Sequence, residues 1–271
     1  LVPRGWAASM MLRLSLSPAC WKAAMATGAE VLISCGASTA PANVLLCALY
    51  GAKSVVVMNP APIPLRRFHL AFVPAHDGVP TRPNVVPTAG ALSAVTSEQL
   101  AQARERLRAH PRFRAPQAGP VIAVLLGGST DEYQLTPSFA DGLVQQVLAA
   151  CEDVNGTCAV TTSRRTGAAV ERLLSERLSN HPRCGLLLLA GRDQLNGTLE
   201  GMLGWADVVV VTGESISMMS EACASGKRVI VVGLPLRHAP RGGLTKAQRY
   251  IRVLTDDGYA RAHPLPEVGH A

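Results

Sequence analysis

The stretch VVVVTGESISMMSEACASG (residues 208–226) places small polar residues between an apolar run and a helix-like segment. A helix that begins there offers backbone N–H groups without intrahelical partners, together with the positive end of its dipole. Both features favour the binding of a diphosphate. The residues that we expect to form this diphosphate-binding turn are Thr212, Gly213, Ser215, Ile216 and Ser217.

Glu221 follows this turn and stands inside the expected helix, six residues after Ser215. A carboxylate about one and a half turns into a helix can accept hydrogen bonds from ribose hydroxyls, as acidic residues do in dinucleotide-binding folds. The alternative interpretation is an ordinary solvated helix glutamate. On the first interpretation, the diphosphate and its ribose share one helix.

Two other loops carry residues suited to phosphate. Gly127 and Gly128 follow an apolar run, and their lack of a Cβ lets the backbone approach a phosphate closely. Ser129 adds a hydroxyl, although many strand-to-helix turns need glycine for steric reasons alone. The second loop consists of Thr162, Ser163, Arg164 and Arg165. Its two arginines could clamp an anion, or one of them could cap a neighbouring helix end.

His76 and Asp77 in PAHDG form the candidate catalytic pair. A histidine oriented by a carboxylate can act as a general base at pH 7. The alternative is a turn closed by the aspartate beside a surface histidine.

These loops need a scaffold that brings them together. In the second half, the apolar runs VIAVLL, TCAVTT, GLLLL, VVVV and RVIVV alternate with amphipathic helix patterns. Strands that are apolar throughout are typical of a parallel sheet covered on both faces. Right-handed crossovers then bring the strand-to-helix loops to one edge of a doubly wound sheet. The three polar loops are therefore expected at a common edge.

The first half reads as strand, helix, strand, strand, followed by a helix from Ser97 to His110. Residues 111–120 contain three prolines and serve as the expected linker. Residues 1–5 match a thrombin-cleavage remnant, so residues 1–10 are set aside. The expected domains are 11–116, a partial α/β domain, and 117–250, the nucleotide-binding domain. A tail, 251–271, packs back toward the first domain.

Composition narrows the classes of function. The 271 residues are 48% hydrophobic, enough for a core, and no apolar run is long enough to span a bilayer. The net charge of +7 comes mainly from arginine, which favours phosphate or carboxylate partners. The arginines are dispersed and aromatics reach only 4%, so nucleic acid is not expected as a partner. Seven scattered cysteines without a C-x-x-C pair argue against a metal site and favour reduced thiols in the cytoplasm.

The blocks TSRRT and LGWADVVVVTGESISMMSEACASGK, with FHLAFVPAHDG and NVVPTAGALSAVT, resemble the plant mitochondrial fission factor family of the "elongated mitochondria" type and its bacterial relatives. The resemblance covers about residues 31–258. It implies a non-catalytic adaptor with a protein partner, because the plant factor recruits a dynamin-like GTPase.

The 208–226 stretch also resembles the donor-binding helix of GT-B glycosyltransferases, particularly the enzyme that forms lipid II. This resemblance implies two Rossmann-like domains, with a nucleotide diphosphate-sugar in the cleft between them. Ser215, Ile216 and Ser217 would hold the diphosphate, and Glu221 the ribose. The early glycine loop of that family is missing here, so the N-terminal domain reads as truncated.

We therefore expect metal-independent glycosyl transfer from a nucleotide diphosphate-sugar, with a UDP-linked sugar as the first candidate donor and no separate cofactor. The acceptor would be anionic or membrane-associated, and the protein would lie in the cytoplasm or at a membrane surface. One alternative is the adaptor. Another is a sugar-nucleotide epimerase or hydrolase on the same fold, because fold alone does not decide function.

Overall fold

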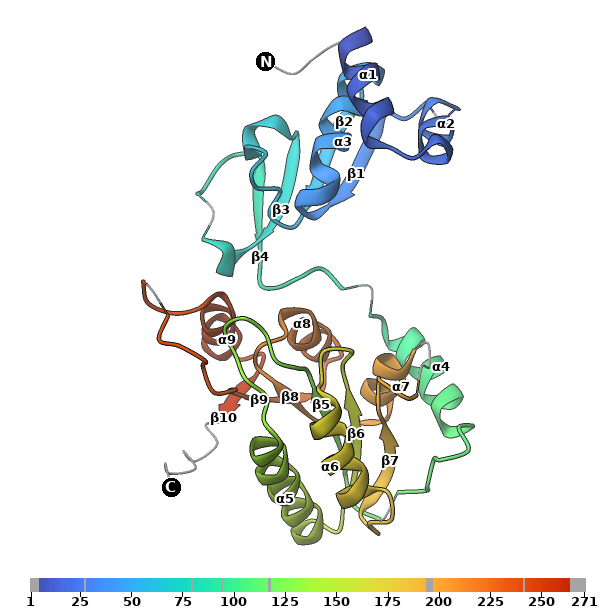
Figure 1. Ribbon diagram of the computed structural model, residues 1–271, viewed down its shortest axis with the longest axis vertical. Helices are drawn as coiled ribbons and strands as arrows, with labels where there is room; N and C mark the ends of the chain where they lie inside the picture. Colours follow the sequence, from blue (N-terminus) through green and yellow to red (C-terminus); the bar gives the residue numbers. More distant parts are fainter. Residues whose placement is uncertain are drawn as a thin grey trace. The chain divides into compact units, whose positions relative to one another are not determined.

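The computed structural model describes residues 5–26, 28–78, 80–93, 95–116, 118–193, 197–240 and 242–263. The chain divides into two compact units, residues 1–92 and 93–271. Each unit contains one parallel β-sheet (Figure 1). The expected α/β class with two parallel-sheet domains is thereby confirmed.

The first unit has a four-stranded sheet in the order β1-β2-β3-β4, with every neighbouring pair parallel. Helix α3 packs between this sheet and α1: its Ala40 lies with Val56 of β2, and its Leu45 lies with Leu12 of α1. The elements are α1 (Trp6–Ser15), α2 (Pro18–Ala26), β1 (Val31–Cys35), α3 (Gly36–Tyr50), β2 (Lys53–Val57), η1 (Leu65–Arg67), β3 (Leu70–Pro74), η2 (Ala75–Asp77) and β4 (Val85–Thr88).

Three features of this unit differ from the sequence-based expectation. Helix α1 begins at Trp6, inside the ten residues set aside above, because Ala8 and Leu12 are buried against α3. Helix α2 and strand β4 are not predicted by the sequence pattern either. Strand β4 has only four residues, includes Pro87 and pairs with β3, so its sequence carries little strand signal.

The second unit has a six-stranded sheet in the order β10-β9-β8-β5-β6-β7, with all pairs parallel. The chain order runs outward from β5 to β7, then restarts at β8 on the other side of β5, so the order reverses between β5 and β8. The elements are α4 (Ser97–Arg108), β5 (Val121–Leu126), α5 (Pro137–Asp153), β6 (Thr157–Thr162), α6 (Ala168–Leu178), β7 (Cys184–Leu188), α7 (Thr198–Trp205), β8 (Val208–Thr212), α8 (Ile216–Ala224), β9 (Arg228–Val232), α9 (Lys246–Asp256) and β10 (Arg261–His263).

Helices cover both faces of this sheet, as the continuous apolar strands predicted. Helices α5 and α6 bury Leu143 and Leu174 against one face. Helices α4, α7 and α8 bury residues such as Leu107, Met202 and Met219 against the other. The doubly wound arrangement is visible in Figure 1 and brings the strand-to-helix loops to the carboxyl edge of the sheet.

The boundary between the units lies before α4, not in the proline cluster at 111–120. Helix α4 belongs to the second unit because it packs closely on α7. A Cβ added to Gly204 would lie 2.2 Å from the carbonyl oxygen of Leu100, and one added to Gly201 would lie 3.0 Å from that of Ala103. Close approach of the two helices therefore depends on glycine in α7.

Helix α9 also packs on the second unit. Its Ala247 lies in the core under α5, while Tyr250 and Leu254 lie in the core under α7 and α8. Strand β10 then pairs with β9. The predicted tail, residues 251–271, begins inside α9, and residues 264–271 lie outside the described part of the chain.

Candidate functional site

The three polar loops follow β5, β6 and β8, which are neighbours in the order β8-β5-β6. Because these strands are parallel, their carboxyl ends lie at one edge of the sheet. The loops after β5 and β8 flank the point where the strand order reverses. Ligands of open α/β sheets bind at such points.

The glycine loop after β5 is held by side chains from the β8 loop. The N–H of Gly127 donates to Thr212 Oγ1, and the N–H of Gly128 donates to Glu214 Oε1, both at 2.8 Å. The hydroxyl of Thr166 donates to the carbonyl of Gly127. Hydrogen bonds with the β8 loop and with Thr166 therefore hold the glycine loop on both sides.

The missing Cβ atoms of this loop have a steric reason, which was the alternative interpretation of the glycines in the sequence. A Cβ on Gly127 would lie 1.6 Å from Glu214 Oε1, and one on Gly128 would lie 2.3 Å from the carbonyl of Arg165. The sequence pattern predicted that a phosphate would approach the backbone of these glycines closely. In the structure, Glu214 and Arg165 occupy that space. Ser129 also has a local role, since its Oγ accepts a hydrogen bond from the N–H of Leu135 at 3.0 Å.

Glu214 was not among the predicted site residues. Its side chain is buried, with 8% of the residue exposed. Burial raises its pKa, although hydrogen bonds from the backbone and from Thr212 and the charge of Arg165 oppose this shift. Its Oε2 has no hydrogen-bond partner among the described residues. A charged residue shortly after four consecutive valines was the available signal.

Helix α8 begins at Ile216, within the segment predicted to bind a diphosphate. Ser215 occupies the N-cap position, but its side chain makes no capping hydrogen bond. The first backbone hydrogen bond of the helix runs from Met219 N to Ser215 O, at 3.0 Å. The N–H groups of residues 216–218 therefore have no intrahelical acceptor. Gly213 plays a packing role, since a Cβ there would lie 2.8 Å from Ile251 Cδ1.

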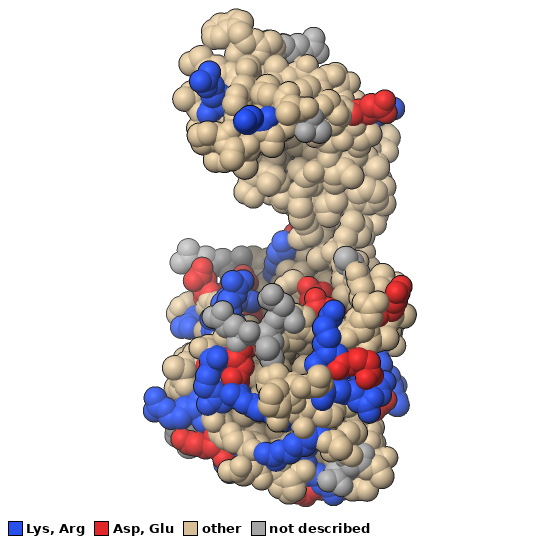
Figure 2. Space-filling view, turned by 90° about the vertical axis from the view of Figure 1, so that its right-hand side faces the viewer, with Lys and Arg blue, Asp and Glu red and all other residues tan. Residues whose placement is uncertain are grey.

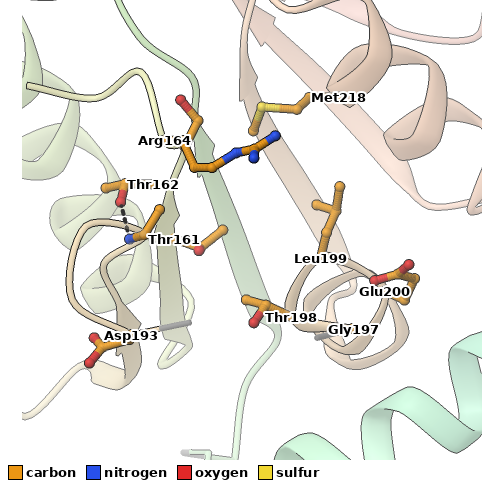
Figure 3. A pocket seen from close by; sticks show the side chains of 11 residues that line it. Thr161, Thr162, Arg164, Asp193, Gly197, Thr198, Leu199, Glu200 and Met218 are labelled. Atoms are coloured by element: carbon orange, nitrogen blue, oxygen red, sulfur yellow. Dashed lines mark hydrogen bonds between the residues drawn. The ribbon is translucent and has the colours of Figure 1, made fainter. Parts of the chain in front are cut away.

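A pocket of about 550 Å³ opens beside these loops (Figure 3). One wall is the loop after β6, and the other is the first turn of α7, which also lacks a side-chain cap at Gly197. The lining residues are Thr161, Thr162, Ser163, Arg164, Ala190, Asp193, Gly197, Thr198, Leu199, Glu200 and Met218. Of the predicted site residues, this set contains Thr162, Ser163 and Arg164.

Arg164 is the main cation of the pocket. Its exposed side chain extends across the opening toward Met218 (Figure 3). A second guanidinium lies near the α7 wall, because a Cβ added to Gly197 would be 3.7 Å from Arg106 Nη2. Arg165 is not among the residues that line the pocket. It lies beside the glycine loop, where its N–H donates to Ser163 Oγ at 3.1 Å.

Thr162 anchors the floor of the pocket. Its Oγ1 accepts the N–H of Ala190 and donates to Glu171 Oε1, both at 2.8 Å. The Ala190 contact is the dashed line in Figure 3. These bonds tie the loop after β6 to the loop after β7, so the wall that carries Arg164 is fixed.

Glu221 of α8 is influenced by the charge of Glu200 of α7. Glu221 is half-buried, and burial raises its pKa, with a further upward contribution from the negative charge of Glu200. Glu200 lines the pocket. The helix that carries the predicted diphosphate turn thus also places a carboxylate near the pocket wall, and the ribose assignment stays a prediction.

His76 and Asp77 lie in the first unit, in η2 directly after β3. Both side chains are buried, and His76 Nε2 lies 4.0 Å from Asp77 Oδ1, too far for a hydrogen bond. The histidine is therefore not the surface residue of the alternative interpretation. Since the two units are described separately, the cleft between them and the catalytic role of this pair stay predictions.

Three further properties of the described residues bear on the class of site. No group of three or more of their His, Cys, Asp or Glu side chains is arranged to hold a metal ion. No helix within these residues is both long and apolar enough to cross a membrane. All seven cysteines are free thiols.

Comparison with solved structures identifies the fold. A protein from Listeria monocytogenes assigned as a UDP-N-acetylglucosamine 2-epimerase matches with a TM-score of 0.59 and 13% identity, over 96% of this chain and 68% of that one. The glycotransferase of kitacinnamycin matches with a TM-score of 0.51 and 18% identity, over 95% and 67%. Both have the GT-B fold, which confirms the expected architecture.

Comparison of sequences identifies the family. "Mitochondrial fission protein ELM1" of Arabidopsis thaliana is 28% identical over 233 residues, which cover 76% of this chain and 52% of the plant protein. The chain thus spans about half the length of this curated relative. The sequence model of the family "Mitochondrial fission ELM1" matches residues 3–269. The chain therefore belongs to the mitochondrial fission ELM1 family, with a GT-B-like fold.

Proposed function

We propose that this chain binds a nucleoside diphosphate, linked to a sugar, at the carboxyl edge of the sheet in the second unit. The observation that carries this proposal is the pocket in which Arg164 faces the first turns of α7 and α8. Uncapped helix N-termini and a guanidinium both favour a diphosphate. Arg164, the first turn of α7 and, from α8, Met218 line this one pocket.

Each part of the ligand has a matching part of the site. The N–H groups at 216–218 and the guanidinium of Arg164 would bind the diphosphate, and Glu221 would accept hydrogen bonds from the ribose. The base would lie between Leu199 and Met218, whose side chains give the pocket apolar surface. UDP is the first nucleotide to test, because the fold neighbour from Listeria is named for a UDP-sugar.

The proposed reaction is glycosyl transfer without a metal ion. The bond between the sugar and the diphosphate would break, a bond to an acceptor hydroxyl would form, and the hydroxyl proton would pass to a base. Arg164 and the two helix N-termini would stabilise the negative charge that develops on the leaving diphosphate. The acceptor would be anionic or membrane-associated, and His76 would be the base.

Thermal unfolding in the presence of nucleotides tests the proposal directly. A ligand at about one hundred times its dissociation constant stabilises the folded state by about 2.7 kcal/mol. We expect such a shift with UDP or a UDP-sugar, and a smaller one in Arg164→Gln. Unchanged melting curves with the uridine, guanosine, thymidine and cytidine diphosphates would contradict the proposal.

One observation favours the second candidate, a non-catalytic adaptor. The carboxylate of Glu214 accepts the Gly128 N–H that a phosphate would otherwise use. An adaptor would keep the fold and bind a protein partner, with or without nucleotide. Consumption of a nucleotide sugar separates the candidates: an adaptor consumes none, a transferase needs an acceptor, and an epimerase or hydrolase needs none.

A further inference from the structure

A second pocket, of about 370 Å³, lies along the edge strand β7. The segment that follows α4 forms one wall, and its Arg114 donates a backbone hydrogen bond to Gly185 of β7 at 2.8 Å. The end of α6 forms another wall. The residues that matter for the argument are Arg112, Arg114, Arg192, Leu178, Cys184 and Leu186.

Three guanidinium groups line this pocket. Among the described ion pairs, only one carboxylate, that of Asp193, pairs with any of them. Arg112 Nη1 lies 2.7 Å from Asp193 Oδ2, and Arg192 Nε lies 3.8 Å from Asp193 Oδ1. Asp193 Oδ2 also accepts the N–H of Leu189 at 3.0 Å. Because Arg112 and Arg192 contact the same carboxylate, they are close enough for one further anion to contact both.

Arg114 contributes positive charge without a carboxylate partner in the described structure. Its Nη2 donates to the carbonyl of Ser179 at 2.6 Å, and its Nη1 donates to that of His181 at 3.5 Å. These bonds fix the guanidinium at the end of α6, where the helix dipole compensates its charge only in part. A guanidinium has five N–H donors, so further donors remain for a ligand.

The floor of the pocket is apolar and the surroundings are basic. Leu178, Cys184 and Leu186 are buried there. Residues 97–116 carry five arginines and two glutamates, and all five arginines are exposed. Figure 2 faces the side on which α4 and β7 lie in Figure 1, and Lys and Arg side chains are spread over the second unit there, with Asp and Glu side chains among them. The surrounding charge therefore favours an anion over a neutral ligand.

The simpler interpretation is that Arg112 and Asp193 only fasten the segment after α4 to the loop after β7. That interpretation explains one of the three guanidinium groups. It leaves Arg192 at 3.8 Å from a carboxylate that is already bonded twice, and Arg114 without a carboxylate partner among the described ion pairs. A ligand with two negative charges would balance the positive charge of the three guanidinium groups that Asp193 does not neutralise.

We propose that this pocket is a second binding site, which takes the phosphoryl group of a phosphate monoester. A phosphate dianion offers oxygens in several directions and matches the planar fork of arginine. This pocket shares no lining residue with the proposed nucleotide pocket, although Asp193, which lines the nucleotide pocket, contacts Arg112 and Arg192. The proposal does not depend on nucleotide binding. The phosphoryl group can come from a small soluble molecule or from a lipid headgroup, and the experiment distinguishes these two sources.

Equilibrium dialysis with radiolabelled inorganic phosphate tests the site in the full chain. Arg192→Gln removes a guanidinium that is 53% exposed and only loosely paired, so folding should not change. We expect phosphate affinity to fall about fivefold to tenfold, the loss of one partly screened charge-assisted contact. Arg192→Lys, which keeps the charge but not the fork, should lose less.

Arg177→Gln is the matched control, because Arg177 is 51% exposed and paired with Asp141 rather than with Asp193. It should leave phosphate affinity unchanged. Arg164→Gln, in the nucleotide pocket, should also leave it unchanged. Loss of binding in Arg164→Gln but not in Arg192→Gln would assign phosphate to the nucleotide pocket and overturn the proposal. So would equal affinity in Arg192→Gln and Arg177→Gln, or no phosphate binding at millimolar concentration together with no vesicle binding.

Vesicle sedimentation tests whether the phosphoryl group belongs to a lipid headgroup. The probe is phosphatidylcholine vesicles with and without phosphatidic acid, whose headgroup is a phosphate monoester. Binding that requires phosphatidic acid, and that Arg192→Gln weakens but Arg177→Gln does not, would assign the phosphoryl group to a lipid. Phosphate binding without vesicle binding would assign it to a soluble ligand. Vesicle binding that Arg192→Gln and Arg177→Gln weaken equally would reflect general surface charge and would contradict the proposed site.

Discussion

The carboxylate of Glu214 accepts a hydrogen bond from the backbone N–H of Gly128, with 2.8 Å between Oε1 and N, although the two residues are 86 positions apart. This bond joins the loops after β5 and β8 at the point where the strand order reverses. It holds a buried carboxylate in a position where the sequence predicted a phosphate. The stability and the ligand affinity of the second unit should therefore both depend on Glu214.

Glu214→Gln should change how stability depends on pH. Burial raises the pKa of Glu214, so the folded protein holds the protonated form more readily than the unfolded chain does. This contribution to stability is present below the unfolded pKa and is lost as pH rises through the folded pKa. Glutamine does not ionise. We expect the free energy of unfolding of the variant, minus that of the wild type, to increase between about pH 4 and pH 7.

Urea unfolding at several pH values measures this difference, and other titrating groups cancel because both proteins share them. Glu176→Gln, at an exposed position on α6, is the control and should show no such trend. A difference that decreased as pH rose would mean that the folded state stabilises the ionised form of Glu214.

Gly127→Ala should destabilise the protein because the new Cβ would stand 1.6 Å from Glu214 Oε1. Overpacking of this kind costs about 1–3 kcal/mol. Chemical denaturation measures the loss. Gly142→Ala provides a control of opposite sign, since Gly142 lies within α5 with nothing near its Cβ position, and alanine favours a helix by up to about 1 kcal/mol.

A double variant tests whether the clash is the cause. Glu214→Ala removes the carboxylate atoms that a Cβ at position 127 would meet, so Gly127→Ala should cost less in that background than in the wild type. Additive losses would show that the glycine is required for another reason.

Arg164→Gln should weaken the binding of the nucleotide that gives the largest thermal shift. Its guanidinium is exposed and faces the pocket, and no ion pair with it occurs in the described part of the chain. Loss of a charge-assisted contact should lower affinity about tenfold with little change in melting temperature. Titration calorimetry measures this, with Arg172→Gln on the exposed side of α6 as control. Equal losses in both variants would contradict a specific role for Arg164.

The second sheet was predictable from sequence because strands buried on both faces read as continuous apolar runs, as in Val121–Leu126 and Val208–Thr212. Strand β10 was missed, since it is a three-residue exposed edge strand without an apolar run. The turn at 212–217 could be found because its polar residues are consecutive. The partnership of Glu214 with Gly128 could not, because it depends on which strands become neighbours.

The pocket walls and the domain boundary could not be predicted from the sequence either, because both depend on which elements pack against each other. Glu200 and Asp193 line the pocket only because α7 and the loop after β7 fold beside β6. The proline cluster suggested a boundary, but the close fit of α4 on Gly201 and Gly204 of α7 moves the division of the chain to before α4. Such fits between distant helices leave no periodic pattern in either segment.

Gly204→Ala should therefore loosen α4 from α7. The added Cβ would lie 2.2 Å from the carbonyl oxygen of Leu100, and backbone atoms yield less easily than a flexible side chain. We expect a loss of about 1–3 kcal/mol in the free energy of unfolding and weaker nucleotide binding, because the first turn of α7 lines the pocket. Gln102→Ala, at an exposed position of α4, is the control. Stability equal to that of the control would contradict the packing of α4 on α7.

Glu221→Ala tests the ribose assignment. If Glu221 accepts hydrogen bonds from the ribose, its loss should cost about 1.5–3 kcal/mol of binding, or about tenfold to a hundredfold in affinity. The free energy of unfolding should increase in this variant, although its affinity for nucleotide decreases. Burial and the charge of Glu200 both raise the pKa of Glu221, so its ionised form is unfavourable in the folded state. The variant should gain stability relative to the wild type as pH rises toward neutrality.

Glu200→Gln separates the two effects, because it removes the repulsion while leaving Glu221 in place. This control should share the gain in stability near neutral pH, yet keep most of the affinity for nucleotide. Calorimetric titration and urea unfolding of the two variants give both quantities. If Glu221→Ala gained stability but bound the nucleotide as tightly as the wild type, Glu221 would be a strained helix residue, and the ribose would have to bind elsewhere in the pocket.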